Sequence, residues 1–185
     1  MKKLVLVIVI LVIGALGFFL FPSHKSNSTL VAYFSATGNT KGVAEQLATV
    51  IGADLFEIKP EQLYTTEDLN WRNDKSRAAI EMADKNSRPL ITNKVEGMEK
   101  YKIVFIGFPI WWGREPSIID TFVTSYDLSG KILIPFATSG STPNTDEAVA
   151  NLRLLAPNTS VPNGTRFPVD VSGEELKTWA SEWLK

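Results

Sequence analysis

Cysteine is absent from this 185-residue chain, and histidine occurs once, at His24. Without cysteine the protein has no disulfide framework, no thiolate nucleophile, no cysteine-ligated iron–sulfur cluster and no lipid-modified cysteine. Because His24 lies ahead of the region in which we expect a folded domain, that domain has no Ser–His–acid triad and no histidine-based zinc or haem site. Redox chemistry in this protein would therefore require an organic cofactor.

A surplus of basic residues is also lacking, because 19 Lys and Arg stand against 20 Asp and Glu. Residues 1–28 hold three lysines and no acidic residue, so residues 29–185 hold 16 basic and 20 acidic residues, a formal net charge of −4. Binding of nucleic acid depends on clustered Lys and Arg, and the sequence has no such cluster. We expect no nucleic-acid partner.

The amino-terminal segment is one long apolar run, Leu4–Phe21. As a helix it would span about 27 Å, close to the hydrocarbon thickness of a bilayer. Lys2 and Lys3 precede it, which favours a cytoplasmic amino terminus and a domain on the extracytoplasmic side. The alternative is a cleaved signal that leaves the domain secreted. The run is longer than the usual 7 to about 15 apolar residues of a signal, but residues 26–28 offer a small-x-small cleavage site.

We therefore expect a single-pass membrane anchor and short tether over residues 1–28, followed by one domain over residues 29–185. Within the domain, strand and helix patterns alternate. Short apolar runs predict strands at 30–34, 103–107 and 131–136, alternation predicts one at 54–58, and residues 165–167 form a short candidate for the fifth. Helical spacing of apolar residues predicts helices at 43–51, 72–85, 116–125, 146–155 and from 172 onward. Ser172 and Glu175 form a capping box at the start of the last of these. This alternation implies an α/β fold with a mostly parallel sheet covered on both faces.

The loop after the first strand reads Ser35-Ala36-Thr37-Gly38-Asn39-Thr40 and leads directly into a helix. Hydroxyl groups, a glycine and the free amides of a helix amino terminus form a nest for a phosphate. The loop matches neither the G-x-G-x-x-G nor the G-x-x-x-x-G-K-[ST] motif. A polar turn with a helix cap would have a similar composition, so both interpretations stay open on this loop alone.

Two further loops follow strands at the same edge of the predicted sheet. Residues 108–113 contain adjacent tryptophans, of which we expect one to face a planar ligand and the other to pack inward. Residues 138–142 are polar and flexible, and could donate hydrogen bonds to ring oxygens. The tryptophans alone could be structural anchors. Ligands of parallel sheets bind at this edge, so the three loops together predict a phosphorylated planar cofactor.

Three motifs carry a resemblance to a known family: S-A-T-G-N-T at 35–40, G-F-P-I-W-W-G at 107–113 and G-K-I-L-I-P-F-A-T-S-G at 130–140. On these the chain resembles the flavodoxins, in particular flavodoxin-like proteins with a P-I-W-W-G loop. The resemblance covers roughly residues 29–185. It implies a flavodoxin-like, doubly wound five-stranded parallel sheet of order 2-1-3-4-5, preceded here by one transmembrane helix, and a non-covalently bound FMN.

The resemblance also implies which residues would bind FMN, and it implies no catalytic residue or metal site. The phosphate would be held by Ser35, Ala36, Thr37, Gly38, Asn39 and Thr40; the ring would lie beside Pro109, Ile110, Trp111, Trp112 and Gly113, with Trp111 against it; and Thr138, Ser139 and Gly140 would face its pyrimidine edge. The Trp112–Gly113 peptide would be able to reorient, since a peptide next to glycine changes conformation at low cost. Many flavodoxins carry a tyrosine in the third loop. This chain has none there, so either Trp71 covers that face of the ring or the ring is more exposed.

Three functions remain open from the sequence. The first is an FMN-binding electron carrier at the membrane, serving redox partner proteins. The second is an NAD(P)H-dependent quinone or flavin reductase, for which the missing aromatic would leave room. The third is a tethered binding module without FMN. Beside these loops, Lys41 and Arg114 could help to bind a phosphate or another ligand, but we expect them to be solvated cations. We expect Trp179 and Trp183 to pack in the core, and Asp146 and Glu147 to favour a helix amino terminus.

Overall fold

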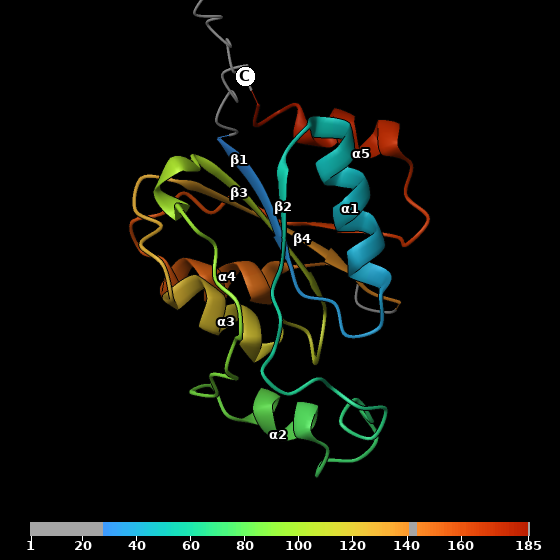
Figure 1. The fold of residues 1–185 in the computed structure, drawn as a ribbon. Coiled ribbons are helices and arrows are strands. Elements are labelled where there is room, and N and C mark those ends of the chain that lie inside the picture. Colours follow the sequence, from blue (N-terminus) through green and yellow to red (C-terminus); the bar gives the residue numbers. More distant parts are fainter. Residues whose placement is uncertain (1–27, 141–143, 185) are drawn as a thin grey trace, which may run out of the picture.

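The computed structural model describes residues 28–140 and 144–184, which form a five-stranded parallel sheet with helices on both faces (Figure 1). The strand order is β2-β1-β3-β4-β5, as the resemblance to the flavodoxins implied. The strands are β1 (Thr29–Tyr33), β2 (Asp54–Glu57), β3 (Ile103–Pro109), β4 (Ile132–Thr138) and β5 (Thr165–Phe167). The winding reverses at β1, where β2 pairs on one side and β3 on the other.

The helices are α1 (Asn39–Ile51), α2 (Arg77–Ala83), α3 (Ser117–Thr124), α4 (Asp146–Leu155) and α5 (Gly173–Ala180), with a short 3₁₀ turn at Met98–Lys100. Both α4 and β5 have their predicted bounds, and Asp146 and Glu147 lie in the first turn of α4 as expected. The predicted cap of the last helix is confirmed, because Ser172 Oγ accepts a hydrogen bond from the Glu175 amide at 3.2 Å.

The second helix is shorter than predicted: the prediction was residues 72–85, whereas α2 begins at Arg77 and ends at Ala83. The side chains of Asn70 and Asn73 accept hydrogen bonds from backbone amides two residues on, at 3.1 and 3.0 Å. Such local bonds compete with the helix and keep residues 70–75 in turns. The Ser76 side chain then caps α2 by accepting from the Ala79 amide.

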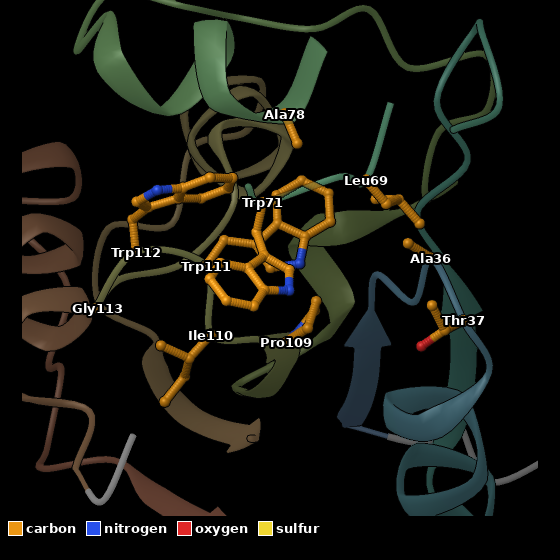
Figure 2. Close-up of a pocket in the computed structure, with 10 residues that line it drawn as sticks. All are labelled: Ala36, Thr37, Leu69, Trp71, Ala78, Pro109, Ile110, Trp111, Trp112 and Gly113. Atoms are coloured by element: carbon orange, nitrogen blue, oxygen red, sulfur yellow. The ribbon is translucent and has the colours of Figure 1, made fainter. Parts of the chain in front are cut away.

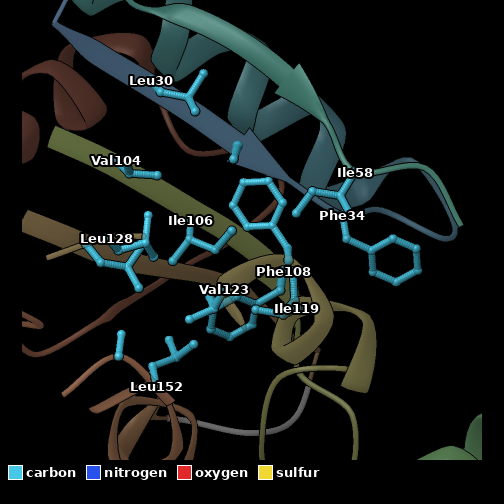
Figure 3. Packing of buried hydrophobic residues seen from close by; sticks show 14 of the residues in the cluster. Leu30, Phe34, Ile58, Val104, Ile106, Phe108, Ile119, Val123, Leu128 and Leu152 are labelled. Carbon is cyan, nitrogen blue, oxygen red and sulfur yellow. The ribbon is translucent and has the colours of Figure 1, made fainter. Parts of the chain in front are cut away.

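Two hydrophobic cores cover the two faces of the sheet. The larger lies between the sheet and α3 and α4, and Figure 3 shows Ile106, Phe108 and Ile119 meeting in it. The smaller lies under α1 and α5, where Trp179 packs against Phe105, Phe136 and Phe167 at centroid distances of 5.4, 6.4 and 5.0 Å. The predicted core role of Trp179 is therefore confirmed, and Trp183 is partly buried against the same core.

The two ends of the sheet differ in what they carry. The amino end of β1 and the last turn of α5 lie at one end of the molecule, whereas α2 lies beyond the opposite end, near the carboxyl ends of the strands (Figure 1). Within residues 28–140 and 144–184, no helix is long and apolar enough to span a membrane. The predicted anchor, Leu4–Phe21, lies outside the described residues.

Candidate functional site

The loop between β1 and α1 presents the amino end of a helix. Gly38 precedes α1 with a φ of 91°, a conformation that glycine adopts without steric penalty. No side chain caps the helix, so the amides of its first turn have no partner within it. Ser35 Oγ accepts a hydrogen bond from the Gly38 amide at 3.1 Å and shapes the loop. An uncapped helix amino terminus behind a left-handed glycine is suited to an anion, one of the two interpretations that the loop composition left open.

Thr40 links two of the predicted binding loops. Its side chain is buried, and its Oγ1 forms a 2.9 Å hydrogen bond with Thr138 Oγ1 at the end of β4. The Thr40 hydroxyl therefore makes one hydrogen bond within the protein, and the Thr40 amide, in the first turn of α1, has no partner within the helix. The bond also joins the first loop to the third.

The second loop contains a tight turn built on left-handed residues. The Trp111 amide donates to the Arg114 carbonyl at 2.9 Å and the Arg114 amide donates to the Trp111 carbonyl at 3.1 Å. Between them, Trp112 has a φ of 45° and Gly113 a φ of 89°. Positive φ at both central residues is typical of a type I′ turn, and it is strained for a bulky residue such as tryptophan.

The two tryptophans of this loop have different surroundings. Trp111 is partly buried, with its ring edge-on to Phe34 at 5.7 Å and to Tyr64 at 5.2 Å between centroids. Trp112 remains 48% exposed. Of the two adjacent tryptophans, Trp111 is therefore the one that packs against the core, and Trp112 is the one that remains open to solvent.

Tyr64 anchors the segment after β2 behind Trp111. Its hydroxyl donates to Glu81 Oε2 at 2.5 Å, and the Arg77 guanidinium lies 4.1 Å above its ring. Burial, followed by the hydrogen bond to Glu81, raises the pKa of Tyr64 far above its ordinary value, so the phenol stays neutral. Tyr64 was not predicted from the sequence, because it lies in an irregular segment without a periodic pattern.

Two cavities meet over Trp111 at the carboxyl ends of the strands. The first, of about 490 Å³, is lined by aromatic and apolar residues including Trp71, Trp111 and Trp112. Figure 2 shows these tryptophans on one side and Ala36 and Thr37 of the first loop on the other, with Leu69 close to Ala36. The second, of about 540 Å³, is more polar, with Asn39, Thr138 and Ser139 in its wall. Both volumes lie in the range of about 300–1,000 Å³ typical of small-molecule sites.

Most of the predicted binding residues reach these cavities. Eleven of the fourteen line one or both: Ala36, Thr37, Asn39, Pro109, Ile110, Trp111, Trp112, Gly113, Thr138, Ser139 and Gly140. Ser35, Gly38 and Thr40 shape the loop without lining either cavity. Trp71, which was considered as a cover for the ring, lines the first cavity and is 65% exposed.

Arg166 and Asp170 line the second cavity but were not predicted. Arg166 Nη1 donates to the Ser139 carbonyl at 2.9 Å, so it ties the end of β5 to the third loop. The end of β5 lies at the same edge as the other strand ends, and that rule could have identified both residues.

The expectation for Arg114 was wrong. Its side chain is buried rather than solvated, and it pairs with Glu115 and Asp120 at 3.2 and 3.3 Å. The expectation holds for Lys41, which is exposed. Among the residues that the structure describes, no group of three or more His, Cys, Asp or Glu side chains is arranged to hold a metal ion.

The family profile described as Flavodoxin matches residues 28–183. The chain belongs to the flavodoxin family. Among solved structures, this flavodoxin domain is similar to a candidate flavoprotein from Bacteroides eggerthii, at 39% identity and a TM-score of 0.80, covering 85% of this chain and 98% of that one. It is also similar to a candidate flavoprotein from Bacteroides uniformis, at 41% identity and a TM-score of 0.79, covering 84% and 98%.

A more distant structure, a flavoprotein in complex with FMN from Lactobacillus acidophilus, shares the fold at 22% identity and a TM-score of 0.66, covering 86% of this chain and 99% of that one. A search of curated proteins gives no match. The family assignment and the strand order agree with the flavodoxin-like fold expected from the three loop motifs.

Proposed function

We propose that this protein is an FMN-binding electron carrier, attached to the membrane by its amino-terminal segment with the flavodoxin domain on the extracytoplasmic side. One observation carries the proposal: two adjoining cavities meet over Trp111, with a helix amino terminus at one side and tryptophans at the other. FMN is the cofactor of the flavodoxin family, and when bound it supplies reversible one- and two-electron redox chemistry.

The residues present fit FMN. The uncapped amides at the start of α1 suit a phosphate, and the macrodipole of the helix adds favourable potential there. Trp111, held edge-on by Phe34 and Tyr64, would present a rigid wall to a planar ring. Thr138, Ser139 and Gly140 would lie along the polar side of the ring, with Arg166 beside them.

The charge of the domain suits a carrier rather than a nucleic-acid-binding protein. Residues 29–185 have a formal net charge of −4. Negative charge disfavours addition of electrons at the site, and so tends to lower the reduction potential. It would also steer the domain toward basic redox partners through small, salt-sensitive interfaces.

The placement of Ser28 supports a site that faces away from the membrane. Ser28 directly precedes β1, and its carbonyl accepts hydrogen bonds from the Lys102 and Ile103 amides at the amino end of β3. The binding loops begin at Ser35, about 23 Å of extended chain further on. A tether joined at Ser28 would therefore present the site to partners outside the lipid phase.

The test of cofactor and chemistry uses the full-length chain purified in detergent. We expect apoprotein to bind FMN in a 1:1 ratio, to be reduced by a partner reductase, and to pass electrons on to an acceptor protein without consuming NAD(P)H itself. Failure to retain FMN would contradict the proposal. The Trp111→Ala variant should bind FMN more weakly. Trp183 packs against the smaller core and lines neither cavity, so the Trp183→Phe variant should bind FMN as tightly as the natural chain.

The test of location is separate. In intact cells, an externally added protease should cleave the domain, and the full-length chain should remain with the membranes after washing with salt. A protected domain would contradict the topology, and a free domain lacking residues 1–28 would show that the segment is a cleaved signal.

An NAD(P)H-dependent quinone or flavin reductase is the alternative. It is favoured by the aromatic-free third loop and by the open apolar cavity beside Trp71, which could admit a second planar molecule. Rapid, saturable oxidation of NAD(P)H by the FMN-loaded protein, with transfer to a quinone, would establish the reductase in place of the carrier.

A further inference from the structure

A buried group of charged side chains lies directly behind the Trp112–Gly113 turn. Arg114 Nη1 donates to Glu115 Oε1 at 3.2 Å and to Asp120 Oδ2 at 3.3 Å. The Asn151 side-chain amide, from α4, donates to Glu115 Oε1 and also to Asp120 Oδ1, the latter at 3.2 Å. The group therefore joins the segment after the turn to α3 and α4.

Few charges surround Glu115. Arg114 faces it from its own segment and Asp120 from α3, while α4 contributes the neutral Asn151. Beyond Asp120, the segment after α2 contributes Arg88, whose Nη1 lies 3.6 Å from Asp120 Oδ2. Two carboxyl groups thus share a small set of donors away from water.

One oxygen of this group is unsatisfied. Glu115 is fully buried, and its Oε2 has no hydrogen-bond partner among the described residues. A buried carboxylate oxygen without a donor is costly, whereas a protonated carboxyl is tolerated. Burial, together with the hydrogen bond to Asp120 and its negative charge, raises the pKa of Glu115 to about 8.

The same group holds one end of the turn. Arg114 closes the turn through both of its backbone hydrogen bonds to Trp111, and its side chain is locked among the buried carboxyl groups. A tryptophan at a φ of 45° persists only where the surrounding structure holds it there. The turn borders the first cavity through Trp111, Trp112 and Gly113.

We propose that Glu115 is a positioning residue for the flavin loop: as a neutral carboxyl it keeps Arg114 and Asp120 packed and the Trp112–Gly113 turn closed, and its ionisation loosens the turn and weakens FMN binding. A second buried negative charge beside Asp120 repels the Asp120 carboxylate, and because Arg114 bonds to both carboxyl groups, their separation shifts the Arg114 side chain and with it the turn. The FMN part rests on the proposed function, whereas the movement of the turn does not.

The experiment uses the full-length apoprotein in detergent, titrated between pH 7 and pH 9 while the tryptophan fluorescence is recorded. We expect a transition near pH 8 that is absent in Glu115→Gln and in Trp112→Phe. Glu147→Gln is the matched control, because Glu147 is an exposed acid near the same turn and a Cβ atom at Gly113 would lie 3.0 Å from its Oε2. That variant should keep the transition.

FMN binding is then measured over the same range. The dissociation constant should rise at least about threefold between pH 7 and pH 9 in the natural chain and in Glu147→Gln, and should stay constant in Glu115→Gln. Asp120→Asn provides a second variant, and should move the fluorescence transition to lower pH because the neighbouring charge is removed. A transition that persists in Glu115→Gln, or that is unmoved by Asp120→Asn, would overturn the proposal. Absence of FMN binding at every pH would instead count against the proposed function, while the apoprotein titration would still decide the role of Glu115.

Discussion

Thr40 Oγ1 and Thr138 Oγ1 lie 2.9 Å apart, although 98 positions separate the two residues in the sequence. Both side chains are buried, and the bond connects the first turn of α1 with the end of β4. It fixes the distance between the anion nest and the polar third loop. Two residues expected to face a cofactor thus help to hold two of its binding loops together.

This hydrogen bond can be tested with a double-mutant cycle. Thr40→Val or Thr138→Val alone should each lower the free energy of unfolding by about 1–3 kcal/mol, because a buried hydroxyl is left without a partner. The double Val variant should cost less than the sum of the two, since both hydroxyls are then gone. Urea denaturation measures the three values, and strict additivity would show that the two hydroxyls do not interact.

Gly107 is predicted to tolerate no side chain. A Cβ atom there would lie 2.3 Å from the ring of Phe136, across the pairing of β3 with β4. Gly107→Ala should therefore destabilise the protein by about 1–3 kcal/mol through overpacking. Gly42→Ala is the matched control: it lies within α1 with no atom within 4 Å of its added Cβ, and it should stabilise by about 0.5–1 kcal/mol. Thermal unfolding of both variants decides the matter.

Trp71 should affect FMN binding without affecting stability. It lines the first cavity but is 65% exposed, so its removal takes little from the core. Loss of an aromatic contact should weaken FMN binding about tenfold in Trp71→Ala, or about 1.4 kcal/mol. Leu63→Ala, in the same segment but lining neither cavity, should change neither property. If Trp71→Ala and the natural chain bind FMN with equal affinity, Trp71 does not cover the second face of the flavin ring.

The stability of the protein should depend on pH through Glu115. Its pKa is about 8 in the folded state, against an ordinary value of 4.5, so the folded state holds the proton more tightly than the unfolded state. The contribution of this group to the free energy of unfolding is therefore complete below about pH 4.5, decreases as the pH rises, and is lost above about pH 8. Between pH 5 and pH 8 the natural chain should lose at least about 1 kcal/mol relative to Glu115→Gln. Urea denaturation of both proteins across this range measures the difference, and parallel curves would contradict it.

Local patterns were sufficient for much of the fold. Apolar runs predicted the three central strands, β1, β3 and β4, because a buried parallel strand needs continuous apolar residues. The edge strands β2 and β5 are partly exposed, and were predicted from an alternating pattern and from a short segment of three residues. The bounds of α4 and β5 agree with the prediction, as does the capping Ser172. The segment after β2 was predicted poorly, because Asn70 and Asn73 make local side-chain bonds that a helical period does not reveal.

The site shows the same division. Its loops were identified from residue types that follow strands, since parallel strands end at one edge of the sheet. Arg166 was missed because its strand has only three residues, and Tyr64 because nothing in its neighbours indicates that its ring meets Trp111.

The sequence by itself determined the order of strands and helices, the three binding loops and the exclusion of cysteine and histidine chemistry. These depend on composition and on short-range spacing. Only the tertiary structure decided that Trp111 is packed while Trp112 is exposed, that the hydroxyls of Thr40 and Thr138 bind each other, and that Arg114 is buried with Glu115 and Asp120. The bond between Thr40 and Thr138 joins segments 98 positions apart, and the carboxyl groups around Arg114, although near it in sequence, are enclosed by Asn151, 31 positions beyond Asp120. A local pattern carries no information about which distant side chain will fill the remaining space.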